Sequence, residues 1–165
     1  MDQSRWLLLG VCALSLFGVG QIWLVQLSSY KLWPLVGARE FHAYHAAWWR
    51  GIWGVILAPA ALLALGALLM LWCPAPGVPR WSIWTGCGLQ AALLLGTALW
   101  WGPLMARLET SNGGLDPGRY RLMVDTHWAR VAIVTSYGAL VLWMLAQGAG
   151  NATIGALVSS AITVT

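Results

Sequence analysis

The sequence predicts an all-α membrane protein, with four transmembrane helices in an antiparallel up-down bundle. Of its 165 residues, 59% are hydrophobic and 8% are charged, and the mean hydropathy is +0.70. A soluble domain usually carries about 25% charged residues, so this chain has too few to cover a water-exposed surface. Charged residues are absent from four long segments: 6–30, 51–79, 81–106 and 131–165. Each segment exceeds the roughly 20 residues that a helix needs to cross the hydrocarbon layer.

Four membrane spans follow from these uncharged segments. We expect them at 6–27, 48–72, 81–105 and 124–146, forming one transmembrane domain over residues 1–147. The first apolar run continues past the usual length of a signal peptide, and no A-x-A cleavage pattern follows, so an uncleaved helix is expected. The proline-rich CPAPGVPR turn predicts that spans two and three are antiparallel neighbours. Asp116 and Pro117 are typical first residues of the last helix.

Tryptophan is unusually abundant, with 13 residues, and none falls at the centre of a predicted span. An indole ring is apolar, but its N–H group prefers the headgroup region, so tryptophans gather in belts at both membrane surfaces. We therefore expect most of these side chains to anchor helix ends.

Polar residues gather at one end of the predicted bundle. Eleven of the fourteen charged residues and all three histidines lie in or beside the two connections at that end. Seven lysines and arginines are found there, against two at the opposite end. The positive-inside rule then predicts that loops 28–47 and 106–123 lie in the cytoplasm and that both termini lie outside.

Three histidines and two arginines are the candidate ligand-binding residues. His42 and His45 share one helix face, and His127 lies at the same membrane end, so the three rings converge if spans two and four are neighbours. Imidazole suits a metal, a haem or a chlorophyll-type pigment. Interfacial histidines without a bound group and acid–base chemistry are the alternatives. Arg130 and Arg50 either reach toward the headgroups or bind an anionic ligand or lipid headgroup.

Two further features concern packing. Gly88, Ala92 and Gly96 form a ladder of small residues that permits close helix contact. We favour contact inside the bundle, with a partner-facing surface as the alternative. The tail over 148–165 is uncharged and apolar, so we expect it to lie on the membrane surface or against another protein.

Two stretches resemble an uncharacterised family of small bacterial four-helix membrane proteins, and more distantly the anthrone-oxygenase-like membrane proteins. The matching residues are Val25, Gln26, Tyr30, Phe41, Tyr44, His45, Pro59, Leu122, Val124, Thr126, Trp128 and Arg130. The chain departs from the family pattern at three positions. It has Ala64 where the family has Glu, His127 where it has Asn, and Tyr137 near an expected Arg. The resemblance implies a bacterial inner-membrane protein, and the loss of polar groups at these positions indicates a family member recruited for packing.

No P-loop, GxGxxG, GxSxG or HExxH motif is present, so no catalytic residue is assigned. We predict a non-catalytic accessory subunit that packs within a larger membrane complex of the electron-transfer or light-harvesting type. Its expected partners are the lipid bilayer and other integral membrane subunits, with no nucleic acid. A small oxidoreductase or a metal-, haem- or pigment-binding protein is the alternative, and a transporter or lipid-binding protein is the third possibility.

Overall fold

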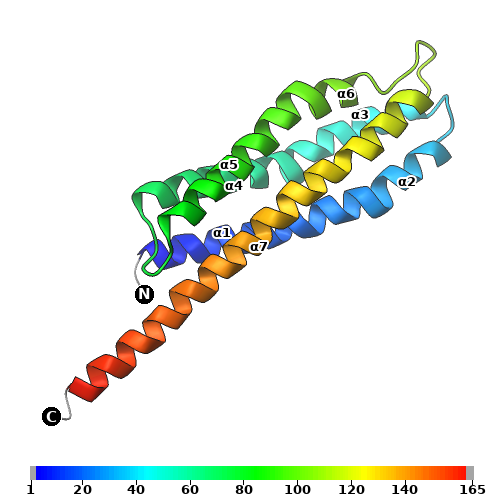
Figure 1. Ribbon diagram of the computed structural model, residues 1–165. Coiled ribbons are helices and arrows are strands. Elements are labelled where there is room, and N and C mark those ends of the chain that lie inside the picture. The colour runs from blue at the N-terminus through cyan, green and yellow to red at the C-terminus, as the bar shows by residue number, and fades with distance from the viewer. Residues whose placement is uncertain (1–2, 163–165) are drawn as a thin grey trace.

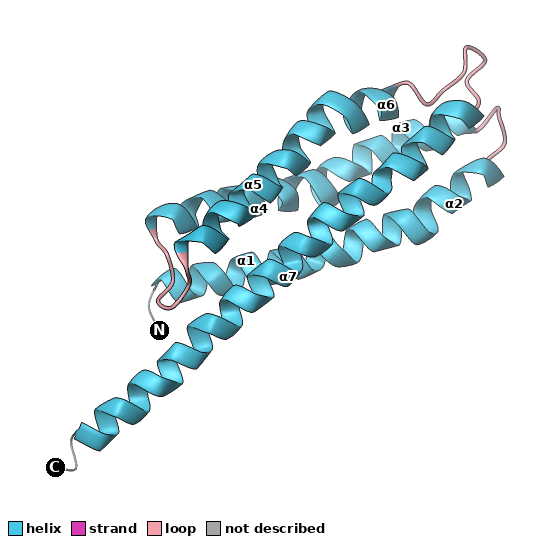
Figure 2. Ribbon diagram, viewed as in Figure 1, coloured by secondary structure: helices cyan, strands magenta, loops and turns pink. Residues whose placement is uncertain are grey.

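A computed structural model describes the backbone of residues 3–162 and the side chains of residues 3–148. It is almost entirely helical (Figure 2). The helical segments are α1 (Gln3–Leu24), η1 (Val25–Ser29), α2 (Tyr30–Leu32), η2 (Trp33–Leu35), α3 (Phe41–Ile52), η3 (Trp53–Leu57), α4 (Ala58–Trp72), α5 (Arg80–Gly96), η4 (Thr97–Trp101), α6 (Gly102–Ala106) and α7 (Pro117–Ile162). The segments η1, η3 and η4 are single π-helical turns, and η2 is a 3-10 turn.

The prediction of four membrane spans is confirmed. Four helices are long and apolar enough to cross a membrane: Gln3–Leu35, Phe41–Trp72, Arg80–Ala106 and Pro117–Gly148. All four extend beyond the predicted bounds, the third by only one residue at each end. In the first span, Lys31 continues the helix beyond its apolar part. The non-helical connections at that end are therefore only 36–40 and 107–116.

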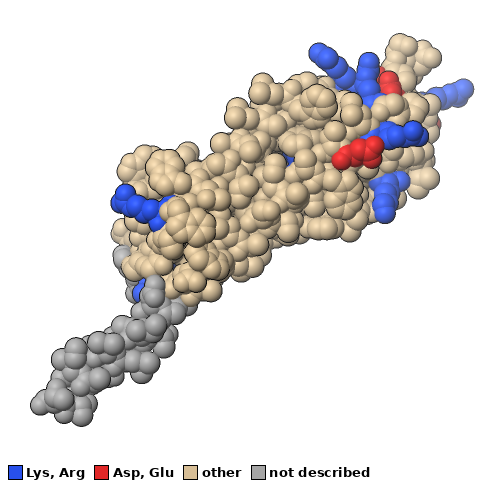
Figure 3. Space-filling model, in the orientation of Figure 1, with Lys and Arg blue, Asp and Glu red and all other residues tan. Residues whose placement is uncertain are grey.

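The four spans form a closed antiparallel bundle. The long helix α7 packs against α1 and α5, while α4 packs against the other sides of α1 and α5. Spans two and four therefore stand diagonally across the bundle. The N-terminus and the turn over 73–79 lie at one end, and connections 36–40 and 107–116 lie together at the other (Figure 1). We call this second end the loop end. Most charged side chains gather there, and the bundle wall between the ends is largely uncharged (Figure 3).

The interior contains two separate hydrophobic cores. The core near the N-terminus is built from Leu8, Val11, Cys12, Leu63, Ala67, Met70, Ala75, Val78, Ile83, Tyr137, Val141 and Met144. The core at the loop end is built from Val25, Tyr30, Trp33, Phe41, Trp101, Met105, Leu108 and Met123. The expected anchoring role is wrong for Trp33 and Trp101, which are 0% and 7% exposed. Trp33 lies in the helical extension beyond the predicted first span, Trp101 lies in η4, and both pack into the core at the loop end.

A proline follows two of the π-helical turns, η3 and η4. Proline has no N–H group, so the carbonyl four residues earlier loses its helical partner. Pro59 follows η3, and the carbonyl of Val55 instead accepts a hydrogen bond from Gln21 Nε2 at 2.6 Å. Pro34 lies in the 3-10 turn η2, where the Tyr30 carbonyl accepts hydrogen bonds from the Trp33 N–H and from Tyr120 Oη, the latter at 2.9 Å. Each of these two side-chain bonds ties two spans together.

The last helix is longer than predicted. It runs without interruption from Pro117 to Ile162, a length of 46 residues, because no proline or positive-φ residue ends it near residue 146. The backbone of the tail over 148–165 therefore continues α7 as far as Ile162. Its side chains lie outside the described residues, and its predicted contact with the membrane or a partner remains a prediction.

The Gln21–Val55 bond gives a direct test of this packing. Replacing Gln21 with Leu leaves the Val55 carbonyl without a partner, and we expect a loss of about 1–2 kcal/mol in unfolding free energy. Changing Pro59 to Ala restores a backbone N–H, so Gln21→Leu should cost clearly less in a Pro59→Ala background. Denaturation of the purified protein in mixed micelles, followed by circular dichroism, measures this coupling. An equal loss of unfolding free energy in both backgrounds contradicts this coupling. The control is Gln147→Leu, at an exposed position, which should have the same effect in both backgrounds.

Candidate functional site

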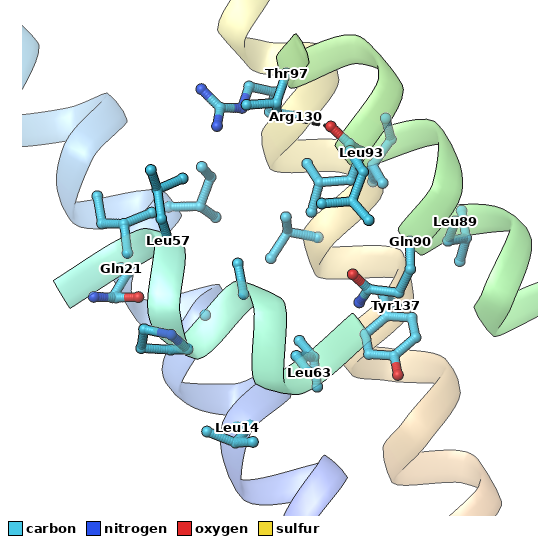
Figure 4. A pocket seen from close by; sticks show the side chains of 18 of the residues that line it. Leu14, Gln21, Leu57, Leu63, Leu89, Gln90, Leu93, Thr97, Arg130 and Tyr137 are labelled. Carbon is cyan, nitrogen blue, oxygen red and sulfur yellow. Dashed lines mark hydrogen bonds between the residues drawn. The ribbon is translucent and has the colours of Figure 1, made fainter. Parts of the chain in front are cut away.

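Two adjoining cavities occupy the region between the two cores. The middle cavity, of about 90 Å³, is lined by residues of all four spans, including Gln21, Leu63, Gln90 and Tyr137 (Figure 4). The loop-end cavity, also of about 90 Å³, is lined mainly by aromatic and aliphatic side chains. Six residues border both cavities: Ile22, Val25, Ile56, Leu57, Thr97 and Arg130. Each of the π-helical turns contributes at least one of these shared residues: Val25 from η1, Ile56 and Leu57 from η3, and Thr97 from η4.

Arg130 is the only charged residue among those that line the two cavities. Its side chain extends from α7 at the loop-side end of the middle cavity (Figure 4). The guanidinium carbon lies 5.1 Å from the centre of the Trp101 ring, and Nε is buried without a hydrogen-bond partner among the described residues. Arg130 forms no ion pair with a described Asp or Glu. The Arg130 side chain as a whole is half-buried, and within the described residues no carboxylate compensates its charge.

Trp101 contributes a second free donor at the same place. Its ring lines the loop-end cavity, and its Nε1 is buried without a partner among the described residues. A Cβ atom built on Gly96 would collide with this ring, so the glycine makes room for the indole beside Arg130. Buried donors normally find an acceptor, and these two side chains together define a pocket that lacks one.

His127 lies one helical turn before Arg130 and is 1% exposed. Its Nδ1 atom is 2.7 Å from Gln26 Oε1, and Gln26 Nε2 donates to the carbonyl of Val124 at 3.3 Å. The edge of the Tyr30 ring packs against the imidazole, with a distance of 4.8 Å between ring centres. His127 also borders the loop-end cavity. This histidine is thus held in place by α1 and its extension.

The other two histidines meet a carboxylate instead. Glu109, in the 107–116 connection, accepts hydrogen bonds from His42 Nδ1 at 2.7 Å and His45 Nδ1 at 2.8 Å. His42 is exposed, whereas His45 is 7% exposed and stacks on Phe41. Partial burial of Glu109 would raise the pKa of its carboxyl, but the two histidine hydrogen bonds outweigh it and hold that pKa below its usual value. Glu109 therefore fastens the connection to α3.

The expected convergence of three histidines is wrong. Glu109 brings His42 and His45 together, while His127 pairs with Gln26, because spans two and four stand diagonally. Within residues 3–148, no group of three or more His, Cys, Asp or Glu side chains is placed to hold a metal ion. A haem or pigment ligand at a single histidine stays a prediction.

The remaining predicted residues lie on the outer surface or beside it. Arg50 is exposed on α3, away from both cavities. Gly88 and Ala92 are exposed on α5, and nothing lies within 4 Å of a Cβ atom built on Gly88. Contact inside the bundle is therefore wrong for these two positions, since that part of the α5 ladder faces outward. Small residues of α5 that do face the interior of the bundle include Gly86, against Tyr137, and Ser82.

Sequence reasoning missed Gln26 and Trp101 as parts of the polar interior. Gln26 and Gln21 are polar residues within uncharged spans, and that was an available signal, because such residues require hydrogen-bond partners in a membrane. The role of Trp101 had no comparable signal.

Comparisons with known proteins identify one partial relative. The chain is 33% identical over 99 residues to the apolipoprotein N-acyltransferase of Prochlorococcus marinus (strain MIT 9313), a match that covers 56% of this chain and 20% of that protein. The chain thus spans about a fifth of the length of the curated relative it matches. No family model matches the chain, and no solved structure matches it. The resemblance to small four-helix proteins stays a prediction.

The Glu109 contacts predict a pH dependence. A carboxylate whose pKa is lowered by folding adds stability above its unfolded pKa, near 4.3, and loses that contribution as the pH falls through the lower folded value. Glu109→Gln should therefore be less stable than the wild type at neutral pH. The difference should shrink as the pH falls below about 4. Thermal unfolding across this range measures it, with the exposed Glu40→Gln as control. A difference that does not depend on pH would contradict this role.

Proposed function

We propose that this integral membrane protein binds an anionic amphiphile inside its bundle, with the negative head at Arg130 and the apolar chain in the middle cavity. The observation that carries this proposal is the uncompensated charge of Arg130, whose Nε has no partner among the described residues. An ionisable residue within a membrane is costly and usually functional. An anionic ligand would compensate this positive charge and so account for an arginine at this position.

The charge count favours a ligand with a single negative charge. Only one charged side chain borders the two cavities, so a monoanion neutralises the site, whereas a dianion leaves a net negative charge in a medium that solvates it poorly. The guanidinium fork suits a carboxylate or a phosphodiester, and the N–H group of Trp101 is a further donor to the same oxygen atoms.

The surroundings of Arg130 favour an amphiphile over a small soluble anion. The middle cavity extends from Arg130 toward the N-terminal core between aliphatic side chains, among them Leu14, Leu63, Leu89 and Leu93 (Figure 4). An acyl chain buried there gains roughly 0.8 kcal/mol per methylene group. The name of the partial relative describes acyl transfer to an apolipoprotein, which is compatible with an acyl ligand, but the proposal rests on Arg130.

Replacing Arg130 with Met tests this function in two ways. We expect palmitate binding in phosphatidylcholine nanodiscs to weaken by at least about 30-fold, because the buried counter-charge is lost. We expect the ligand-free protein to become about 1–2 kcal/mol more stable, because an unpaired charge leaves the interior. Arg50→Met, at an exposed position, should change neither property. Titration calorimetry and denaturation measure the two effects.

Two results would refute the proposal. One is unchanged palmitate binding in Arg130→Met. The other is a wild-type protein that binds the uncharged hexadecanol as tightly as palmitate, since the charge would then have no role in recognition.

A second candidate is the accessory-subunit function expected from the sequence, and the exposed face of α5 favours it. Gly88 and Ala92 lie on the surface of the bundle, and no side chain of residues 3–148 covers Gly88. Small residues on a lipid-facing helix surface allow another transmembrane helix to approach closely. Such a subunit, in a complex of the electron-transfer or light-harvesting type, would present this face to its partner.

The α5 face offers a matched pair of substitutions. Gly88→Leu should leave the stability of the isolated protein within about 0.5 kcal/mol of the wild type, because the added side chain meets open space. It should also abolish co-purification of other membrane subunits in mild detergent. Gly86→Leu should instead destabilise the bundle, since its Cβ atom already lies 3.3 Å from the Tyr137 ring. Partners that remain bound to Gly88→Leu would contradict a role for this face.

A further inference from the structure

We infer that the head of the bound amphiphile carries a hydrogen-bond donor, an O–H or N–H group, close to its negative charge, and that Nε2 of His127 accepts it. This inference rests on the proposed function and narrows the chemical class of the ligand. Arg130 alone selects any anion. His127 and Arg130 together select a hydroxylated or amino-bearing anion.

Gln26 determines which nitrogen of His127 carries the proton. The Gln26 side-chain NH₂ donates to the carbonyl of Val124 at 3.3 Å, which points the amide oxygen at the histidine. This oxygen lies 2.7 Å from His127 Nδ1, and because an amide oxygen only accepts, Nδ1 must be the donor. In a neutral imidazole, Nε2 is then left with a free lone pair.

The neutral form of His127 follows from its surroundings. The side chain is 1% exposed, and burial without a counter-ion opposes a charged ring. The groups that face it are the neutral Tyr30 and Gln26 from the first span, and Arg130 from its own helix. A second positive charge beside Arg130 would raise the cost further.

His127 Nε2 and Arg130 are placed to act on one ligand. No hydrogen bond of Nε2 is found among the described residues, and both side chains border the loop-end cavity. Positions three apart share a helix face, with about 5–6 Å between their Cβ atoms. That spacing suits a compact head in which an anionic group and a hydroxyl are separated by one or two carbon atoms. A β-hydroxy carboxylate is the simplest amphiphile with this arrangement.

Matched fatty acids test the inference. Dibromostearate, whose bromine atoms quench nearby tryptophans, is bound to the full-length protein in phosphatidylcholine nanodiscs at about pH 9, where carboxyls are ionised. Palmitate and its β-hydroxy derivative then compete for the site. We expect the hydroxy acid to bind about five- to tenfold more tightly to the wild type, the effect of one hydrogen bond. In His127→Phe this ratio should fall to about one.

The controls separate the two levels of the proposal. Retained dibromostearate binding shows that His127→Phe is folded, and Ser136→Ala, exposed on the same helix, should keep the wild-type ratio. Equal affinities for both acids in the wild type, or a preference that survives in His127→Phe, overturn the inference alone. No binding of any fatty acid overturns the proposed function as well. Displacement by β-hydroxybutyrate at equal concentration would show that the ligand is a soluble hydroxy acid instead of a lipid.

Discussion

The unpaired charge of Arg130 is the constraint on which the rest of the interior depends. A guanidinium inside an apolar bundle is unfavourable by several kcal/mol unless an anion or a set of acceptors compensates it. Among the described residues, its close neighbour is the Trp101 ring, 5.1 Å away, and a cation–π contact recovers only about 1 kcal/mol. The bundle therefore keeps a charge that its own packing does not neutralise.

The fold makes room for this charge by dividing the core. Prolines near the loop end interrupt the helical hydrogen bonds, and side chains from other spans replace them, as Gln21 does for Val55. The extensions beyond these turns pack into a separate aromatic core around Trp33. The two cavities remain between that core and the N-terminal one, and Arg130 borders both. At the loop end, Glu109 closes the structure by holding two histidines of α3.

Much of the architecture could be predicted from the sequence, because charges are excluded from hydrocarbon and their absence marks each span. The proline-rich turn before Arg80 likewise identified an antiparallel pair. The interior could not be predicted in the same way. The partner of His127 is Gln26, about 100 residues earlier in the chain. Spans two and four stand diagonally in the bundle, and this placement keeps His127 apart from His45. Trp33 and Trp101 have the composition of membrane anchors, yet the helical extensions bury them. The sequence identified Arg130 as a candidate anion-binding residue. Only the structure reveals that no described carboxylate pairs with it.

Native mass spectrometry of the protein, extracted from its own membrane in mild detergent, tests the role of Arg130 most directly. The wild type should retain one anionic amphiphile through gentle activation. Arg130→Met, purified identically, should carry none. A wild-type protein that emerges without a bound lipid, or the same lipid retained by both proteins, would contradict an anion site at Arg130.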